Sequence, residues 1–385
     1  MFFQTALYIS LALCGLGLIY KMVSWFAKNV GIVDESQNLS FGKRLGSALG
    51  GVLATIFSVR IFKLIGLFVV DVLFQGRILK DKDDKIAWLM HILIFFGFMG
   101  CLLFHALGVF VSSAIDPSYQ STLNPWMFMR NLFGLMAMIG LVMAIVRRAV
   151  IQKGELKTTG QDIYAIGIVL TIMVTGFLLE ATKITSHGEF SSMVEEYGDS
   201  SDTESVTALE AYWVRHYGLV SPTVKEPIES ALLASGAEQN EMMCQDCHSK
   251  PSAAFVSFAI AKMTKPVALQ LDRAGVHRGI WLVHILACFL GLAFLAFTKM
   301  FHILSTPLSI LVVGAAKKDP SPAAIATRQV IELQGCNHGG TCHEECPVRQ
   351  KRQERISQDT QFNPVFNYLG TKTNNDLGTR EPTAQ

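Results

Sequence analysis

Long apolar stretches dominate the hydrophobic pattern of this chain. A helix needs about 20 mostly apolar residues to cross the hydrocarbon core of a bilayer. Five stretches meet this requirement: residues 3–26, 86–111, 126–146, 163–181 and 279–304. The pattern therefore predicts an all-α protein, a polytopic membrane helix bundle with five transmembrane helices.

A sixth apolar stretch, residues 45–74, differs from the others because Arg60 and Lys63 lie near its middle. A charged side chain is costly at the centre of a lipid-facing helix. We therefore expect an interfacial helical segment that lies in or along the membrane surface. A sixth membrane crossing is the alternative.

The composition agrees with a membrane protein. Of the 385 residues, 50% are hydrophobic and only 17% are charged, whereas soluble domains contain about 25% charged residues. The net charge is +2, and no basic stripe interleaved with aromatic residues indicates a nucleic-acid partner. The sequence argues against an ordinary soluble enzyme and predicts membrane lipid as its surroundings.

Basic residues indicate the orientation of the helices, because Lys and Arg beside membrane helices concentrate on the cytoplasmic side. They follow the first, third and fifth stretches and fill the segment before the second, with Lys28, Lys43, Arg147 and Lys317 as examples. This distribution predicts a multi-pass protein of the bacterial inner membrane with a periplasmic N-terminus and a cytoplasmic C-terminus. We expect no cleaved signal peptide, because the first stretch has no basic residues before it.

These expectations divide the chain into six parts. They are a first transmembrane helix (1–28), a cytoplasmic or interfacial segment (29–85), transmembrane helices two to four (86–184), a periplasmic loop (185–277), transmembrane helix five (278–305) and a cytoplasmic tail (306–385).

The periplasmic loop is strongly acidic. Between Glu189 and Asp246, Asp and Glu greatly outnumber the basic residues Arg215 and Lys225. Complementary charge speeds the encounter of two proteins. The loop is therefore either a solvated acidic surface or a docking face for a basic soluble protein.

Four histidines lie in two of the predicted helices. His91 and His105 share a face of the second stretch, because 14 residues come within about 40° of four full turns. His284 and His302 share a face of the fifth, where 18 residues make about five turns. If the two helices run antiparallel, His91 lies level with His302 and His105 level with His284. Facing imidazoles in a helix bundle are axial ligands of haem iron, so the pattern predicts two b haems, with ordinary hydrogen-bonded histidines as the alternative.

The acidic loop contains the motif Cys244-Gln245-Asp246-Cys247-His248. In a C-x-x-C-H motif the two thiols bind haem covalently and the adjacent His coordinates its iron. The motif predicts one c haem on Cys244, Cys247 and His248, with a redox dithiol or half of a zinc site as the alternative. The sixth ligand is open among several side chains: Met193, Met263, His187, His216 and His277.

A second cysteine cluster lies in the predicted cytoplasmic tail. Cys336, Cys342, His343 and Cys346 are of the donor types that bind zinc or an iron–sulfur cluster, but their spacing matches no standard ferredoxin motif. Unliganded thiols or a docking element for another protein are the alternatives.

Two groups of residues carry a resemblance to a known family. One is Leu73-Phe74-Gln75-Gly76-Arg77 with Trp88-Leu89-Met90-His91, and the other is Trp281-Leu282-Val283-His284 with Lys299-Met300-Phe301-His302. Over residues 3–184 and 279–309 the chain resembles membrane cytochrome b subunits related to the gamma subunit of respiratory nitrate reductase, above all those of the Dsr-, Hmc- and Tmc-type transmembrane redox complexes of sulfate reducers. The resemblance implies two b haems on the four histidines. It also implies electron transfer between menaquinone or a periplasmic cytochrome c and a cytoplasmic iron–sulfur subunit of the heterodisulfide-reductase type.

These observations lead to one main hypothesis. We expect a transmembrane electron-transfer subunit that passes electrons between a periplasmic multihaem cytochrome c and a cytoplasmic iron–sulfur subunit, with no bond chemistry of its own. The first alternative is a cytochrome b subunit that oxidises menaquinol or reduces menaquinone. Its site would lie near five residues that are also candidates for binding haem propionates or quinone: Trp126, Arg130, Glu180, Lys183 and Arg278. The second alternative is a haem-free membrane anchor.

Overall fold

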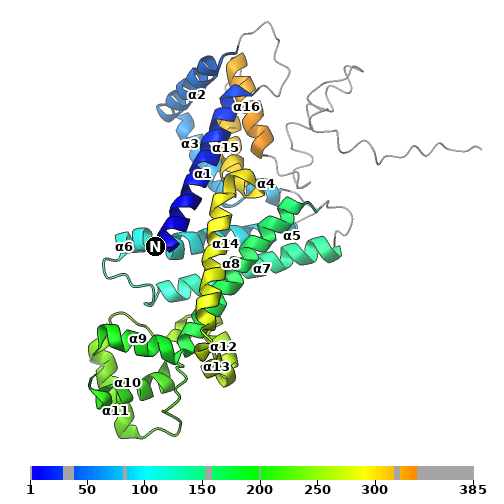
Figure 1. Cartoon of the computed structure of the whole chain (residues 1–385). Coiled ribbons are helices and arrows are strands. Elements are labelled where there is room, and N and C mark those ends of the chain that lie inside the picture. Colours follow the sequence, from blue (N-terminus) through cyan, green and yellow to red (C-terminus); the bar gives the residue numbers. More distant parts are fainter. Residues whose placement is uncertain are drawn as a thin grey trace, which may run out of the picture. The chain divides into compact units, whose positions relative to one another are not determined.

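The structure, a computed structural model, describes residues 2–28, 39–80, 85–151, 158–198, 201–315 and 321–335. Within these residues every regular element is a helix (Figure 1). Five of the described helices are long and apolar enough to cross a membrane: α1 (Phe2–Ala27), α5 with the turn after it (Lys85–Ala106), α7 with its extension (Trp126–Val150), α8 (Gly160–Thr185) and α14 (Val276–Ala293). The predicted all-α fold with five membrane-spanning helices is confirmed.

Short polar residues explain where two helices begin. Thr159 and Asp162 form a capping box at the start of α8, in which the Asp162 carboxylate accepts the Thr159 N–H at 2.9 Å and the Thr159 hydroxyl accepts the Asp162 N–H at 3.4 Å. Ser186 lies between α8 and α9 (His187–Tyr197), and its hydroxyl accepts the N–H of Glu189 at 3.0 Å. This single serine therefore follows one helix and caps the next.

The sixth apolar stretch forms two helices instead of one. α2 (Phe41–Ile56) and the helical run Arg60–Leu73, which begins with α3 (Arg60–Leu67), are bent by 96° at the break between them. Arg60 lies at this bend and not in the middle of a straight helix. The bend is that of a broken span or a re-entrant segment, and the interfacial placement stays a prediction.

The predicted fifth helix is wrong at its C-terminal end. α14 (Val276–Ala293) ends because Phe294 leaves the helical region of backbone conformation, with φ −95° and ψ 6°. Two short 3₁₀ turns separate it from α15 (His302–Ala315). His284 and His302 therefore lie on different helices, and five whole helical turns do not relate them.

The second predicted helix is irregular at one of its histidines. α5 (Lys85–Cys101) continues into a π-helical turn, Leu102–Ala106, which contains His105. α6 (Gly108–Ile115) follows after a break. A π turn holds more residues than an α turn, so the regular spacing that relates His91 to His105 in a straight α-helix does not apply.

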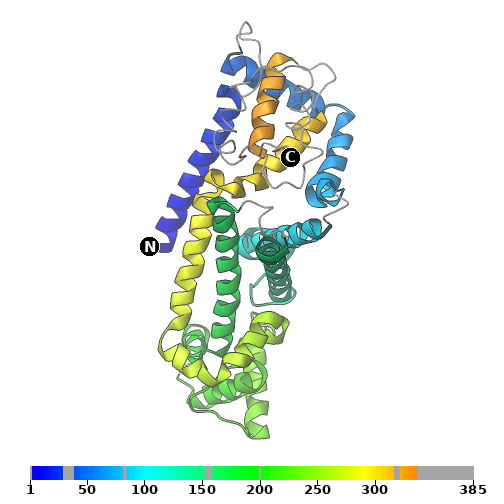
Figure 2. The same cartoon turned by 90° about the vertical axis from the view of Figure 1, so that its right-hand side faces the viewer.

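The first of two compact units consists of Met1–Leu11 and Ile86–Phe294. Here α14 packs along α8, and in both views α5 and α7 (Trp126–Val146) run across this pair rather than alongside it (Figures 1 and 2). The expected antiparallel alignment of the second and fifth helices is therefore wrong. α5 and α7 approach each other so closely that a Cβ on Gly97 would collide with the backbone of Ala137.

The second unit contains the described residues within 12–85 and 295–335. Its centre is the guanidinium of Arg44, which is 1% exposed. This side chain donates to the carbonyls of Trp25 at 2.5 Å and Lys28 at 2.7 Å, near the end of α1. It also donates to the Thr327 hydroxyl of α16 (Pro322–Gly335) at 3.2 Å. Arg44 therefore joins three helices that are distant in sequence.

Replacing this arginine should destabilise the second unit. Arg44→Leu leaves two carbonyls without their donor and should cost about 3 kcal/mol, since hydrogen bonds from charged groups are the stronger ones. The measurement is the melting temperature of the detergent-solubilised protein, with the exposed neighbour variant Lys43→Leu as control. Equal melting temperatures of the two variants would contradict the role of Arg44.

Candidate functional site

Two of the four membrane histidines face each other in the first unit. The ring centroids of His105 and His284 lie 6.4 Å apart, with 50° between the ring planes. Imidazole nitrogens bind first-row metal ions at about 2 Å, so two imidazoles on opposite sides of one iron have centroids about 6 Å apart. The observed separation matches that arrangement, although the carrying helices do not run side by side.

The surroundings of His284 resemble those of a metal-binding histidine. Its Nδ1 lies 3.1 Å from the Ile172 carbonyl and 3.0 Å from the Thr175 hydroxyl of α8. An Nδ1–H donated to that carbonyl leaves Nε2 for a metal ion and fixes the ring orientation. Gly176 of α8 lies beside the ring, because a Cβ at this position would be 3.4 Å from Cε1 of His284.

The other two histidines belong to different units. His91 lies on α5 in the first unit, and His302 begins α15 in the second. Nδ1 of His302 lies 2.6 Å from the Lys299 carbonyl, which is the same kind of backbone contact as at His284. The pairing of His91 with His302 stays a prediction.

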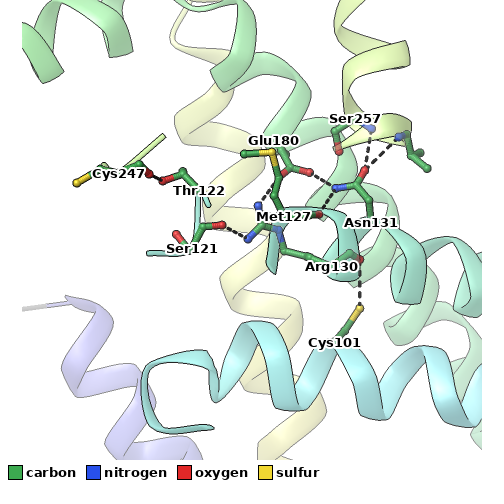
Figure 3. A network of polar contacts seen from close by, with 10 residues as sticks. Cys101, Ser121, Thr122, Met127, Arg130, Asn131, Glu180, Cys247 and Ser257 are labelled. Atoms are coloured by element: carbon green, nitrogen blue, oxygen red, sulfur yellow. Dashed lines mark hydrogen bonds and ion pairs between the residues drawn. The ribbon is translucent and has the colours of Figure 1, made fainter. Parts of the chain in front are cut away.

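An ion pair joins α7 and α8 near the facing histidines. Arg130 and Glu180, each 19% exposed, are in direct contact (Figure 3). Arg130 also donates to the Ser121 carbonyl at 2.9 Å, and the Cys101 thiol lies 3.9 Å from the Arg130 carbonyl. The two charges therefore neutralise each other within a network of polar contacts.

Asn131 extends this network and was not predicted as a site residue. Its side chain is fully buried and donates to the Glu180 carboxylate at 2.7 Å. Its oxygen accepts the N–H groups of Val256 at 3.2 Å and Ser257 at 3.1 Å, at the start of α12 (Phe255–Thr264). The sequence could have indicated this residue, because an amide inside an apolar membrane helix needs a hydrogen-bond partner.

The five residues predicted for quinone or propionates do not form one cluster. Arg130 and Glu180 are in contact, whereas Lys183 pairs with a glutamate of α9 at 3.1 Å and Arg278 is exposed. Trp126 is buried on α7, and its indole N–H has no hydrogen-bond partner among the described residues. The structure therefore brings together part of the predicted set.

A small helical domain carries the cysteine motif. It contains α9, α10 (Thr203–His216) and α11 (Ser230–Met243), which gather beyond one end of α8 and α14 (Figure 1). Its apolar core consists of five buried side chains: Phe190, Val194, Leu209, Leu219 and Cys244. One of the two motif thiols is therefore part of the core of this domain.

The motif forms a tight turn directly after α11. The N–H groups of Cys247 and His248 donate to the Cys244 carbonyl at 3.1 and 2.8 Å. All three residues line a cavity of about 330 Å³, within the usual range of ligand pockets, about 300–1,000 Å³. Two thiols and an imidazole on the wall of one cavity are the donor set of a c haem.

Burial affects the ionisation of the motif. It raises the pKa of the Cys244 thiol to about 11, so the thiol is protonated at neutral pH. Burial also lowers the pKa of His248, which keeps the imidazole in the neutral form that binds a metal ion. The His248 ring lies edge-on to Trp213, with centroids 5.6 Å apart.

The motif is tied to the loop between α6 and α7. The Thr122 hydroxyl donates to the Cys247 carbonyl (Figure 3), and the Ser249 N–H donates to the Thr122 carbonyl at 3.0 Å. The neighbouring Ser121 accepts from Arg130. The neighbouring residues Ser121 and Thr122 thus connect the ion pair between the membrane helices with the cysteine motif.

The tail cluster of Cys336, Cys342, His343 and Cys346 lies outside the described residues. Its predicted role as a metal site or a docking element stays a prediction.

Comparisons with known proteins give partial matches. The chain is similar to one subunit of the dihydromethanophenazine:CoB–CoM heterodisulfide reductase of Methanosarcina thermophila, with 31% identity over 128 residues, 31% of this chain and 47% of the relative. The corresponding subunit of Methanosarcina acetivorans is 27% identical over 176 residues, 43% of this chain and 66% of the relative. No family model matches the chain, and no solved structure matches it.

These matches are limited in extent, because the chain spans about half the length of the first relative. The resemblance to nitrate reductase gamma subunits stays an expectation. Together with the five apolar helices, the matches support one coarse statement: the chain is an integral membrane protein similar to this one subunit of the heterodisulfide reductases.

Proposed function

We propose that this chain is a membrane electron-transfer subunit, a cytochrome b of a heterodisulfide-reductase-type complex, with two b haems and one covalent c haem. The observation that carries the proposal is the pair of facing imidazoles, His105 and His284, at a separation suited to one iron. The names of the similar proteins support it, because each is a subunit of an oxidoreductase.

Haem, when bound, supplies one-electron chemistry, and this chain supplies its ligands. His105 and His284 would hold one b haem, and the predicted pair of His91 and His302 would hold the other. The c haem is held by the three motif residues, Cys244, Cys247 and His248. Arg130 is the candidate partner for a propionate of the haem that His105 and His284 would hold, and Glu180 balances the charge of Arg130.

Charge on the loop supports a basic periplasmic multihaem cytochrome c as one partner. Two glutamates already have partners within the domain. The Glu210 carboxylate lies 3.1 Å from Nε2 of His187, and the Glu226 carboxylate lies 3.0 Å from the Arg215 guanidinium. The loop retains a large excess of acidic residues, which would speed the encounter with a basic protein. A cytoplasmic iron–sulfur subunit is the proposed second partner, with the N-terminus periplasmic and the C-terminus cytoplasmic.

A second candidate function is reaction with a lipid-soluble carrier such as menaquinone. The similar proteins favour it, because the name of their enzyme includes a redox carrier, dihydromethanophenazine. In this chain the site would lie near Trp126, Arg130 and Glu180, where a carboxylate is held beside a cation. Such a carboxylate can accept the proton that a quinol releases on oxidation.

Removing one of the facing imidazoles should remove one b haem. His105→Ala and His284→Ala should each halve the b-haem content of the purified protein, because one axial ligand is lost. Pyridine haemochrome spectra measure this content, and His216→Ala, at an exposed histidine outside the membrane helices, is the control. Full b-haem content in both variants would show that these histidines are not ligands.

Changing the motif cysteines should separate the c haem from the b haems. Cys244→Ser with Cys247→Ser should abolish haem staining of the protein on a denaturing gel and leave the b-haem spectrum unchanged, since only the covalent links are removed. Cys288→Ser, in the membrane helix α14, is the control. Staining that persists in the double variant would refute the assigned attachment site.

Glu180→Gln distinguishes the two candidate functions. If a quinol reacts beside Glu180, losing the proton acceptor should slow quinol-dependent haem reduction by about 10²-fold with the haem content unchanged. If electrons are exchanged only with a soluble cytochrome c, that protein should reduce the haems of the variant at the wild-type rate. Quinol should then reduce the haems of neither the variant nor the wild type. Glu189→Gln, on α9, is the matched control.

A further inference from the structure

The cavity at the cysteine motif has walls from several elements. α9 contributes Met193, Val194 and Tyr197, and α10 contributes a face that includes Val206 and Leu209. The end of α11 and the motif turn complete it, together with two residues from the loop before α7. A ligand bound covalently to the motif would therefore lie between the end of α11 and side chains of other helices.

Three lining side chains beyond the motif have donor atoms of the types found on haem iron, namely Met193, Met243 and Tyr197. Tyr197 is 73% exposed. Met243 directly precedes Cys244 in the chain, so it would lie beside the thioether bond of a haem attached there. A sixth ligand must approach the iron from the face opposite His248, and a residue on a different helix is better placed for this.

Met193 meets this requirement. It lies on α9, is partly buried and packs against the apolar cluster that contains Cys244. Phe190, one turn earlier on the same helix, lies 5.5 Å from Trp213 between ring centroids, and Trp213 contacts the ring of His248. α9 and the motif histidine thus share one packed environment beside the cavity.

The other sulfur and imidazole side chains of this region are engaged elsewhere or exposed. Nε2 of His187 lies 3.1 Å from the Glu210 carboxylate, and Nε2 of His277 lies 3.3 Å from the Glu189 carboxylate. The ring of His216 packs on a tyrosine at 4.5 Å, and Met263 is 80% exposed. None of these four lines the cavity.

We propose that Met193 is the sixth ligand of the c haem, opposite His248. The inference rests on the proposed haem attachment at Cys244, Cys247 and His248. A thioether ligand stabilises ferrous iron and raises the reduction potential relative to a second imidazole. Met193 therefore sets the potential at which this haem exchanges electrons with a soluble partner.

The test compares Met193→Ala and Met193→His with Met243→Ala in the full-length protein, purified in detergent. The ferric wild type should show the sulfur-to-iron charge-transfer band of methionine ligation in the far red. Both Met193 variants should lose this band, and Met193→His should remain low-spin with a lower c-haem potential in a spectroelectrochemical titration. Met243→Ala should retain the band and the potential, and the b-haem spectra should not change in any variant.

Two results would overturn the assignment and are distinguishable from each other. If haem stains covalently on the gel but Met193→Ala keeps the band and the potential, or Met243→Ala loses them, the ligand is wrong and the c haem stands. If the wild type carries no covalent haem, the attachment site itself is wrong and the ligand assignment falls with it.

Discussion

Polar side chains between apolar helices must satisfy one another, because lipid offers them no hydrogen-bond partner. This constraint governs the first unit of the protein. The Arg130–Glu180 ion pair and the Asn131 amide combine charges and dipoles that would be costly alone. The contact of His284 with the Ile172 carbonyl does the same for an imidazole. Each polar group thereby fixes the position of the helix that carries it.

Polar contacts also link the membrane helices to α12 and to the turn of the cysteine motif. Asn131 accepts two N–H groups at the start of α12, and Thr122 holds the turn of the motif through the Cys247 carbonyl. Electron transfer requires redox groups at fixed positions, and a domain anchored by buried amides and backbone hydrogen bonds suits that requirement. The architecture is thus consistent with a chain that positions cofactors and leaves the chemistry to them.

Features that depend on length and composition were predictable from the sequence. The five membrane helices follow from apolar stretches of sufficient length. The bend between α2 and α3 was not predicted, because Arg60 and Lys63 indicated only an interfacial segment, and that placement stays a prediction. Helix irregularities were not predictable, because the break at Phe294 and the π turn around His105 occur inside mainly apolar stretches and no proline marks either position. His105 and His284 lie together although the spacing argument that paired them assumed straight, antiparallel helices. The position of Met193 beside the motif depends on how α9 packs against α10 and α11, which no local pattern encodes.

The number of haems bound by the wild-type protein decides whether this chain is a cytochrome. The protein should be purified in mild detergent, and its b and c haems should be quantified per chain from one pyridine haemochrome spectrum. We expect two b haems and one c haem per chain. A preparation without b haem would contradict it, because the facing imidazoles would then be ordinary hydrogen-bonding groups in a membrane anchor.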